Sequence, residues 1–463
     1  MRQIRLRAIL FISVICICLL GFSITALADD WQERDVPGFS DEDTQVLAFT
    51  TDSNGNVYLV YTINDPTGDI LPLPKAKMYD GTSWTELGAS YISEQNGGQF
   101  IVRYDETSEK LYFGLITING VIHIYEFKDD KWEELANAGR LLRIDPQFIY
   151  YDFQVMSDGS LVVAYVDLLE DGRLTSKVYK DGKWIEYGEP GFTEDTASYI
   201  SLAVDHNNQY VYAGVIIQRS EIEVWRYSTD TGWEVTDNSG IESGYPYWVK
   251  MAIVNGDRPI LIYMDTDFEW KTFGMIYDKG TWQYMDPHPF SPAMIRTFGM
   301  VMDSNGWPVV YFNDSENDNK VTSMKYNGEV WEDFGSRGFT QEGATILFAG
   351  IDKSNVLYVL MPDASSEGRI IRMEYGELEA ESTTSSDTTE DNQGVESDEN
   401  QTTELNNQAD TEQTTETVTP QEKTETGSSS IYLIVSALLG VLFVICIVIF
   451  LLLKRRKKDD EDQ

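Results

Sequence analysis

Hydrophobic and polar residues alternate over short segments along most of this chain, and turn residues separate the segments. Between residues 44 and 88 the apolar segments are Val46–Asp52, Val57–Thr62, Lys75–Tyr79 and Ser83–Leu87. They are rich in Val, Tyr, Leu and Thr, which favour β-strands. The pattern therefore predicts four short strands in this part of the chain.

Polar turn sequences connect the predicted strands. Residues 52–55 read Asp-Ser-Asn-Gly, and residues 303–306 repeat these four letters. Residues 79–81 read Tyr-Asp-Gly at the third connection. Asp can bond its own turn, and Gly or Asn accepts a positive φ, so both sequences are typical of tight antiparallel hairpins.

Tryptophan recurs at nearly constant spacing, which indicates that the four-strand unit is repeated. The series is Trp84, Trp132, Trp184, Trp233, Trp282 and Trp331, with steps of 48, 52, 49, 49 and 49 residues. A fixed period near fifty residues is typical of proteins built by copying one supersecondary unit. An aromatic residue precedes each Trp by five or six positions, and Tyr375 is the last of this series. No Trp follows Tyr375, but Trp31, which lies ahead of the first unit, can take the place of the missing Trp.

One four-stranded sheet cannot bury both of its faces, so the repeats must stack, and radial stacking of such sheets gives a β-propeller. The predicted fold class is all-β, a seven-bladed β-propeller over residues 29–376 with closure by an N-terminal strand. Trp31–Arg34 is expected to complete the last blade, whose other strands are Ile346–Asp352, Val356–Met361 and Arg369–Tyr375. Closure would cover sheet edges that otherwise invite aggregation.

The two ends of the chain indicate where it resides. Residues 1–28 have the basic, apolar and small-residue order of a signal peptide, with an uncleaved anchor as the alternative. Residues 431–453 are apolar and long enough to cross a bilayer as one transmembrane helix. Five basic residues follow at once, so residues 454–463 are expected to be a cytoplasmic tail. We therefore expect a single-pass protein of the cell membrane with an extracellular N-terminal propeller.

Residues 377–430, between propeller and membrane, have a different composition. They are acidic and rich in Ser and Thr, with no aromatic residue. Such a segment cannot bury enough apolar surface to offset the entropy of ordering, so it is expected to be a disordered stalk.

The charge of the chain limits its partners. The formal net charge is −41. Phosphates would be repelled, so nucleic acid is excluded as a partner.

Acidic residues gather in the connections between second and third strands. They are Asp65, Asp69, Asp167, Glu170, Asp171, Asp265, Asp267, Glu269, Asp314, Glu316 and Asp318. In a closed propeller these loops share one face with the blade-to-blade connections, and we take this face as the candidate binding face. Oxygen clusters suit hard cations, so calcium is a candidate cofactor, with solvated loop tips as the alternative.

Aromatic residues occupy the blade-to-blade connections of that face. They are Phe39, Tyr91, Phe192, Tyr245, Tyr247, Phe290 and Phe339. Most are expected to pack between blades, and some to offer a ligand platform.

Motifs for catalysis are absent from the sequence. The three histidines lie in different repeats, and all three cysteines fall in the apolar end segments. No metalloprotease, serine-hydrolase or phosphate-loop motif occurs. No catalytic, cofactor-binding or metal-ligating residue is therefore predicted; binding is favoured over catalysis, and an enzymatic role is left open.

A family resemblance adds to this interpretation. Residues 38–40, 191–193 and 338–340 read Gly-Phe-Ser or Gly-Phe-Thr, and hairpins, strands and Trp follow in order. The repeats resemble those of bacterial cell-surface β-propeller proteins with kelch- or sialidase-like blades of about 49 residues. Residues 228–233 are similar to the sialidase Asp-box, which is a structural turn, so sialidase activity does not follow from it.

The resemblance implies a binding scaffold displayed on a cell surface. The predicted function is a membrane-anchored extracellular module for binding or adhesion, with a glycan, a peptide or a surface protein as ligand. A sialidase-like glycan hydrolase and an extracellular sensor subunit are the alternatives.

Overall fold

The computed structural model describes residues 30–35, 44–63, 73–88, 91–141, 149–207, 210–340, 343, 348–362 and 368–376. All of them belong to one compact unit, residues 1–382. Apart from one short 3₁₀ helix, η1 (Ser315–Asn317), every described element is a strand. The strands are β1 (Asp30–Asp35), β2 (Thr44–Thr51), β3 (Val57–Ile63), β4 (Lys75–Tyr79), β5 (Trp84–Glu86), β6 (Gly97–Asp105), β7 (Lys110–Thr117), β8 (Val121–Lys128), β9 (Lys131–Arg140), β10 (Tyr151–Val155), β11 (Leu161–Val166), β12 (Leu174–Lys180), β13 (Lys183–Glu186), β14 (Ala197–Asp205), β15 (Tyr210–Ile217), β16 (Glu221–Ser228), β17 (Gly232–Val235), β18 (Pro246–Val254), β19 (Arg258–Asp265), β20 (Lys271–Asp278), β21 (Thr281–Tyr284), β22 (Ile295–Met302), β23 (Pro308–Asp314), β24 (Lys320–Tyr326), β25 (Trp331–Asp333), β26 (Phe348–Ile351), β27 (Leu357–Pro362) and β28 (Gly368–Gly376).

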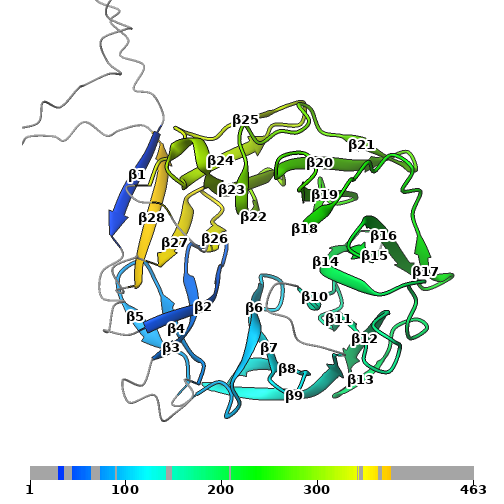
Figure 1. Cartoon of the computed structure of the whole chain (residues 1–463). Helices are drawn as coiled ribbons and strands as arrows, with labels where there is room; N and C mark the ends of the chain where they lie inside the picture. The colour runs from blue at the N-terminus through cyan, green and yellow to red at the C-terminus, as the bar shows by residue number, and fades with distance from the viewer. Residues whose placement is uncertain are drawn as a thin grey trace, which may run out of the picture. The chain divides into compact units, whose positions relative to one another are not determined.

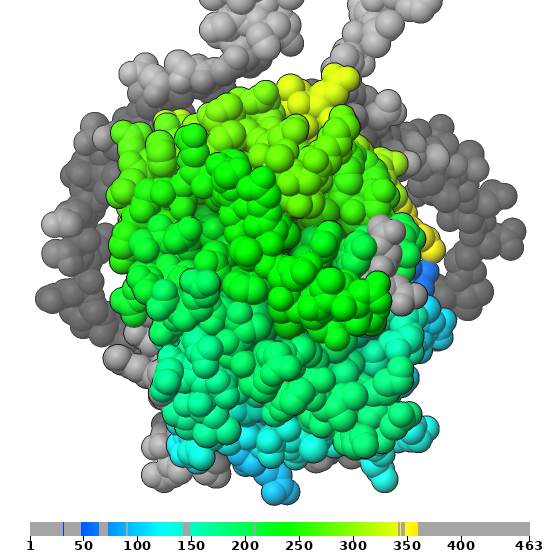
Figure 2. Space-filling model, turned by 90° about the vertical axis from the view of Figure 1, so that its right-hand side faces the viewer, coloured from blue at the N-terminus to red at the C-terminus, as the bar shows by residue number. Residues whose placement is uncertain are grey.

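These strands form seven four-stranded antiparallel sheets, and six of the sheets use four consecutive strands. Figure 1 shows the sheets around a common axis, with β2, β6, β10, β14, β18, β22 and β26 innermost. Figure 2 shows the molecule from the side, where residues of successive sheets, coloured from cyan to yellow-green, form one continuous surface. The chain is therefore an all-β β-propeller, as the sequence predicts.

The remaining sheet joins the two ends of the described chain. Its strand order is β1-β28-β27-β26, and β1 pairs antiparallel with β28 so that Trp31 lies opposite Tyr375. The N-terminal strand thus completes the sheet that the C-terminal strands begin, as the position of Trp31 predicts. Figure 1 shows β1 in blue beside β28 in yellow-orange.

Side chains of the turns explain why the inner hairpins form where they do. The Asp52 carboxylate accepts hydrogen bonds from the backbone N–H groups of Asn54 and Asn56, both at 2.9 Å. Gly55 then takes a φ of +84°, a conformation that other residues rarely adopt. Asp303 and Asp352 make the same pair of contacts in their own turns. One Asp at the start of the turn therefore fixes the same hairpin in three sheets.

The core lies between neighbouring sheets. Second strands are buried along almost their whole length, and all six residues of β11 and all seven of β23 are buried. Because both faces of each sheet meet another sheet, strict alternation of apolar and polar residues is lost in these strands.

The recurring tryptophans connect each sheet to the one before it. In five cases the indole N–H donates to an acceptor within or just after the outermost strand of the preceding sheet, at 2.8 to 3.1 Å. The donors and acceptors are Trp132 and Leu87, Trp184 and Leu135, Trp233 and Tyr187, Trp282 and Thr236, and Trp31 and Phe334. The fixed spacing of Trp thus reflects one inter-sheet contact repeated around the ring.

Several predictions from the sequence concern other parts of the chain. The signal peptide at 1–28, the stalk at 377–430, the membrane helix at 431–453 and the tail at 454–463 all lie outside the described residues. Within the described residues, no helix has the length and apolar character needed to cross a bilayer.

Candidate functional site

The antiparallel order of the sheets gives the ring two distinct faces. The connection between second and third strands and the connection to the next sheet leave from the same edge of every sheet. We call this side the loop face. It carries the described members of the predicted acidic set, whereas Asp65 and Asp69 lie outside the described residues.

Three of the predicted acidic residues are buried and serve as turn anchors. The side chains of Asp167, Asp265 and Asp314 are 6%, 0% and 0% exposed. Asp167 accepts a hydrogen bond from the Leu169 backbone N–H at 2.9 Å, and Asp314 accepts one from the Glu316 N–H at 3.0 Å. Their carboxylates therefore hold the connections in shape from inside.

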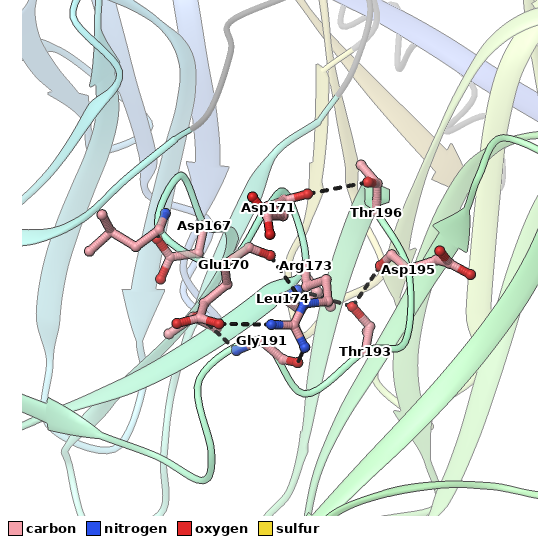
Figure 3. Close-up of polar contacts among 11 residues, drawn as sticks. Asp167, Glu170, Asp171, Arg173, Leu174, Gly191, Thr193, Asp195 and Thr196 are labelled. Carbon is pink, nitrogen blue, oxygen red and sulfur yellow. Dashed lines mark hydrogen bonds and ion pairs between the residues drawn. The ribbon is translucent and has the colours of Figure 1, made fainter.

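Glu170 is held by a neighbouring cation rather than presented to solvent. Its Oε2 lies 2.8 Å from Nη2 of Arg173, whose Nη1 donates to the Gly191 carbonyl oxygen at 2.8 Å (Figure 3). This ion pair joins the connection between β11 and β12 to the connection that leads to the next sheet. The positive charge of Arg173 thus partly offsets the negative charge of Glu170.

The other predicted acidic residues are exposed on the loop face: Asp171, Asp267, Glu269, Glu316 and Asp318. Among the residues that the structure describes, no group of three or more His, Cys, Asp or Glu side chains is arranged to hold a metal ion. Glu269 Oε2 lies 3.6 Å from Nζ of Lys271, so the acidic set divides into buried anchors, two ion-paired residues and separate exposed carboxylates.

Exposed apolar side chains concentrate on the same face. Eight of the eleven large hydrophobic residues that are exposed in the described chain lie on the loop face or at its rim: Ile63, Tyr91, Ile118, Leu169, Tyr245, Phe268, Trp270 and Met294. The other three, Ile185, Val235 and Val330, lie on or beside outermost strands. Exposed apolar side chains that gather on one face mark an interaction site more often than scattered ones do.

Five aromatic residues of one sheet and its connections lie at this face, and we call them the aromatic platform: Tyr245, Tyr247, Trp248, Phe268 and Trp270. The rings of Tyr247 and Trp270 meet edge-on with centroids 5.5 Å apart, and those of Tyr247 and Trp248 are 6.1 Å apart. Phe268 is 47% exposed, Tyr245 45% and Trp270 38%. Trp and Tyr offer large rigid contact areas and dominate the energetics of many binding surfaces.

One buried carboxylate positions both loops of the platform. Asp265 Oδ2 accepts from the Gly244 N–H at 2.7 Å, and Oδ1 accepts from the Tyr245 and Asp267 N–H groups at 3.1 and 2.9 Å. The connection that carries Tyr245 is thereby tied to the connection that carries Phe268 and Trp270. Asp265 is a positioning residue for the platform and is not itself available to a ligand.

Backbone strain coincides with the platform. Trp248, Glu269 and Trp270 have φ values of +62°, +58° and +59°. These left-handed conformations are unfavourable for bulky side chains, and such strain tends to persist at functional sites. The exposed carboxylates of Asp267 and Glu269 flank Phe268 in the same loop.

The aromatic residues of the sheet-to-sheet connections are partly packed against the recurring tryptophans, as the sequence predicts, and partly exposed. Phe192 stacks on Trp233 at 4.5 Å, Phe290 on Trp331 at 4.1 Å, and Phe339 lies 5.0 Å from Trp31. Tyr91 and Tyr245 are exposed, Tyr247 joins the platform, and Phe39 lies outside the described residues.

Phe268 and Trp270 escaped the sequence analysis, which considered this loop only for its carboxylates. The sequence did contain a signal, because two large aromatic residues stand within this acidic connection. Solvated loop tips seldom carry such residues.

The fold defines this chain as a β-propeller, and the comparisons with known proteins add structural neighbours. No protein-family model and no curated protein matches the sequence. A polysaccharide lyase described as an ulvan lyase shares 14% identity at a TM-score of 0.48, over 74% of this chain and 96% of the lyase. The Aleuria aurantia lectin shares 12% identity at a TM-score of 0.41, over 65% and 98% of the two chains. An α-L-arabinanase from Penicillium chrysogenum shares 14% identity at 0.39, over 65% and 98%.

Proposed function

We propose that this protein is an extracellular binding module, a propeller with one blade for each of its seven sheets, and that it takes its ligand on the aromatic platform. The ligand is a glycan, a peptide or a protein of another surface. The observation that carries the proposal is the run of four exposed residues from Asp267 to Trp270, placed beside Tyr245 by the buried Asp265.

Attachment to the membrane is the second part of the proposal. It rests on the order of segments in the sequence, with the signal at 1–28, the stalk at 377–430 and the apolar span at 431–453. The stalk would hold the ring at a distance from the bilayer, where its loop face can meet a ligand.

The physical basis of recognition is the same for each class of ligand. Rings such as those of Trp270 and Phe268 bury apolar area at low entropic cost, because each side chain has only two rotatable bonds. The exposed carboxylates of Asp267 and Glu269 add acceptors for hydroxyl, amide or ammonium donors. Rigid strands under the loops keep the platform in one arrangement, which reduces the entropy lost on binding.

The test is a binding screen of the full-length protein in detergent on glycan and peptide arrays, with two matched variants. We expect Trp270→Ala to weaken binding of the best ligand at least tenfold, which corresponds to about 1.4 kcal/mol. Ile185→Ala is the control, because Ile185 is 41% exposed but lies on β13, away from the loop face.

Both variants should unfold within about 0.5 kcal/mol of the wild type, as is usual for exposed positions. Wild-type affinity in Trp270→Ala would contradict the proposed site. Turnover of an arrayed glycan would show that the protein is an enzyme that acts on glycans and not a binding module.

A further inference from the structure

The aromatic platform is surrounded by more carboxylates than cations. Glu242, Asp267 and Glu269 are exposed on the two connections that carry the platform, one between β17 and β18 and the other between β19 and β20. Neither connection contains a Lys or an Arg. Among the described residues, Glu269 is the one of the three that has an ion pair, because its Oε2 lies 3.6 Å from Nζ of Lys271. The surface around the exposed rings is therefore negative.

The carboxylate of Asp267 lies against the neighbouring connection of the platform. A Cβ at Gly244 would lie 2.5 Å from Oδ2 of Asp267, so only glycine at that position leaves room for this carboxylate. Tyr245 follows Gly244 and Phe268 follows Asp267, and both of these aromatic side chains are exposed. A negative charge is thus placed where the two connections meet, next to residues whose rings face solvent.

Other aromatic rings of the propeller are already covered by cations of the same chain. Nζ of Lys77 lies 5.0 Å from the ring centroid of Tyr61, and the guanidinium carbon of Arg226 lies 4.8 Å from that of Tyr210. Within the part of the chain that the structure describes, no lysine or arginine lies over a ring of the aromatic platform. The platform rings are therefore open to a cation from another molecule.

We propose that the aromatic platform binds a basic peptide segment of a partner protein, with a Lys or Arg side chain placed over the exposed rings and paired with Asp267. A cation is attracted to the face of Trp, Tyr or Phe, and a carboxylate beside it adds a charge-assisted hydrogen bond. A neutral sugar would stack on the same rings but would leave Asp267 without a counter-charge. This inference rests on the proposed function and narrows its ligand to one class.

The charge of the whole chain favours the same class of partner. The formal net charge is −41, and a field of this sign accelerates the approach of a basic segment and opposes that of an acidic one. General attraction of this kind is not specific, so the experiment must separate it from recognition at the platform.

Three peptides of equal length test the charge of the ligand. They consist of six Gly-Lys, six Gly-Arg or six Gly-Gln repeats, each with a fluorescein label. Fluorescence anisotropy would measure their binding to the full-length protein in nonionic detergent, at a salt concentration of about 0.15 M that screens distant surface charges. We expect both basic peptides to bind at least tenfold more tightly than the Gly-Gln peptide. Equal affinities for all three would overturn the proposal.

Two variants that remove the same charge from opposite faces separate the platform from general attraction. Asp230 is exposed in the hairpin between β16 and β17, on the side of the ring away from the loop face. We expect Asp267→Asn to weaken binding of the Gly-Lys peptide at least fivefold, and Asp230→Asn less than twofold. The hydrogen bond from Asp267 to Asp265 uses the backbone N–H, so Asp267→Asn should melt at the wild-type temperature. Equal losses in the two variants would overturn the proposal.

Failure of this inference differs from failure of the proposed site. Trp270→Ala should weaken binding of the Gly-Lys peptide at least tenfold. A neutral ligand whose affinity falls in Trp270→Ala but not in Asp267→Asn, in a protein that does not prefer the basic peptides, would leave the platform in place and contradict a basic ligand. Binding of the basic peptides that is unchanged in Trp270→Ala would contradict both.

Discussion

Individual tryptophans carry the contact between sheets, and the polar part of that contact differs from one position to the next. The Trp184 indole donates to the Leu135 carbonyl oxygen at 2.9 Å, and its ring lies 5.2 Å from that of Tyr179. Trp331 holds the same place in its own sheet, yet within the described residues its indole N–H is buried without a hydrogen-bond partner. The position of the ring is thus common to the two residues, whereas within the described residues Trp184 makes the indole hydrogen bond and Trp331 does not.

We expect Trp184→Phe to lower the free energy of unfolding by about 1–2 kcal/mol, because it removes a donor and leaves the Leu135 carbonyl oxygen unpaired. Trp331→Phe is the matched comparison and should cost less, since it removes a buried donor that has no partner. Trp184→Ala should cost about 3 kcal/mol through loss of the ring. Urea unfolding of the variants would measure these differences, and equal losses for the two Phe variants would contradict the role of the hydrogen bond.

At the scale of elements, the turns after the outermost strands determine how closely sheets approach. Gly188 follows β13 with a φ of +95°, and a Cβ at this position would lie 2.6 Å from Cδ1 of Trp233. Gly88 and Gly335 occupy the corresponding places against Trp132 and Trp31. Glycine is needed there both for the backbone conformation and for the space that the next indole fills.

Gly188→Ala and Gly182→Ala together separate these two requirements. Gly182 has a φ of +78°, but a Cβ at this position would have no atom within 4 Å. We expect Gly182→Ala to cost about 1 kcal/mol from the backbone alone. Gly188→Ala should cost about 1–3 kcal/mol more, because the Trp233 ring must move. Chemical denaturation would measure both, and equal costs would show that the contact with Trp233 is unimportant.

At the scale of the molecule, the ring depends on one strand from the far end of the sequence. Residues 30–35 pair in register with residues 371–376, and the Trp31 indole donates to the Phe334 carbonyl oxygen at 2.8 Å. The first contact completes a sheet, and the second joins that sheet to its neighbour.

Deletion of residues 30–35 should lower the melting temperature by at least 5 °C and make unfolding less cooperative, because it exposes β28 and removes one inter-sheet contact. Terminal segments are otherwise dispensable unless a sheet holds them. Calorimetry would check this expectation, with Trp31→Phe as a milder variant that retains the strand. A deletion variant that melts as late and as sharply as the wild type would show that β1 is not needed for closure.

The ring could be predicted from the sequence because its determinants recur at fixed intervals. Each repeat carries its own strands, turn residues and Trp, so Trp31 and Tyr375 could be assigned to one sheet although they are 344 positions apart. These signals are local, and periodicity alone reveals how the units must stack.

The candidate site could be predicted only in part, because neighbouring residues of one loop have opposite environments. Asp265 is fully buried, whereas Asp267 is exposed. The difference arises because Asp265 accepts hydrogen bonds from the backbone N–H groups of a loop about twenty residues earlier in the sequence. One signal in the sequence was overlooked: Asp167, Asp265 and Asp314 are spaced by 98 and 49 residues, in step with the repeat. Acidic residues that follow the structural period are better interpreted as structural. Trp270 and Phe268 break that period.

The pairing of β28 also determines how the ring would respond to a pull. Residues 368–373 of β28 pair with β27, whereas residues 374–376 pair with β1 alone. In the proposed membrane-anchored protein, tension between a bound ligand and the membrane would reach the ring at Gly376, the last residue of β28. The first hydrogen bonds under load are then those to residues 30–32. In such an anchored protein the N-terminal strand would act as a mechanical clamp, and its pairs with β28 would set the force at which the propeller begins to unravel.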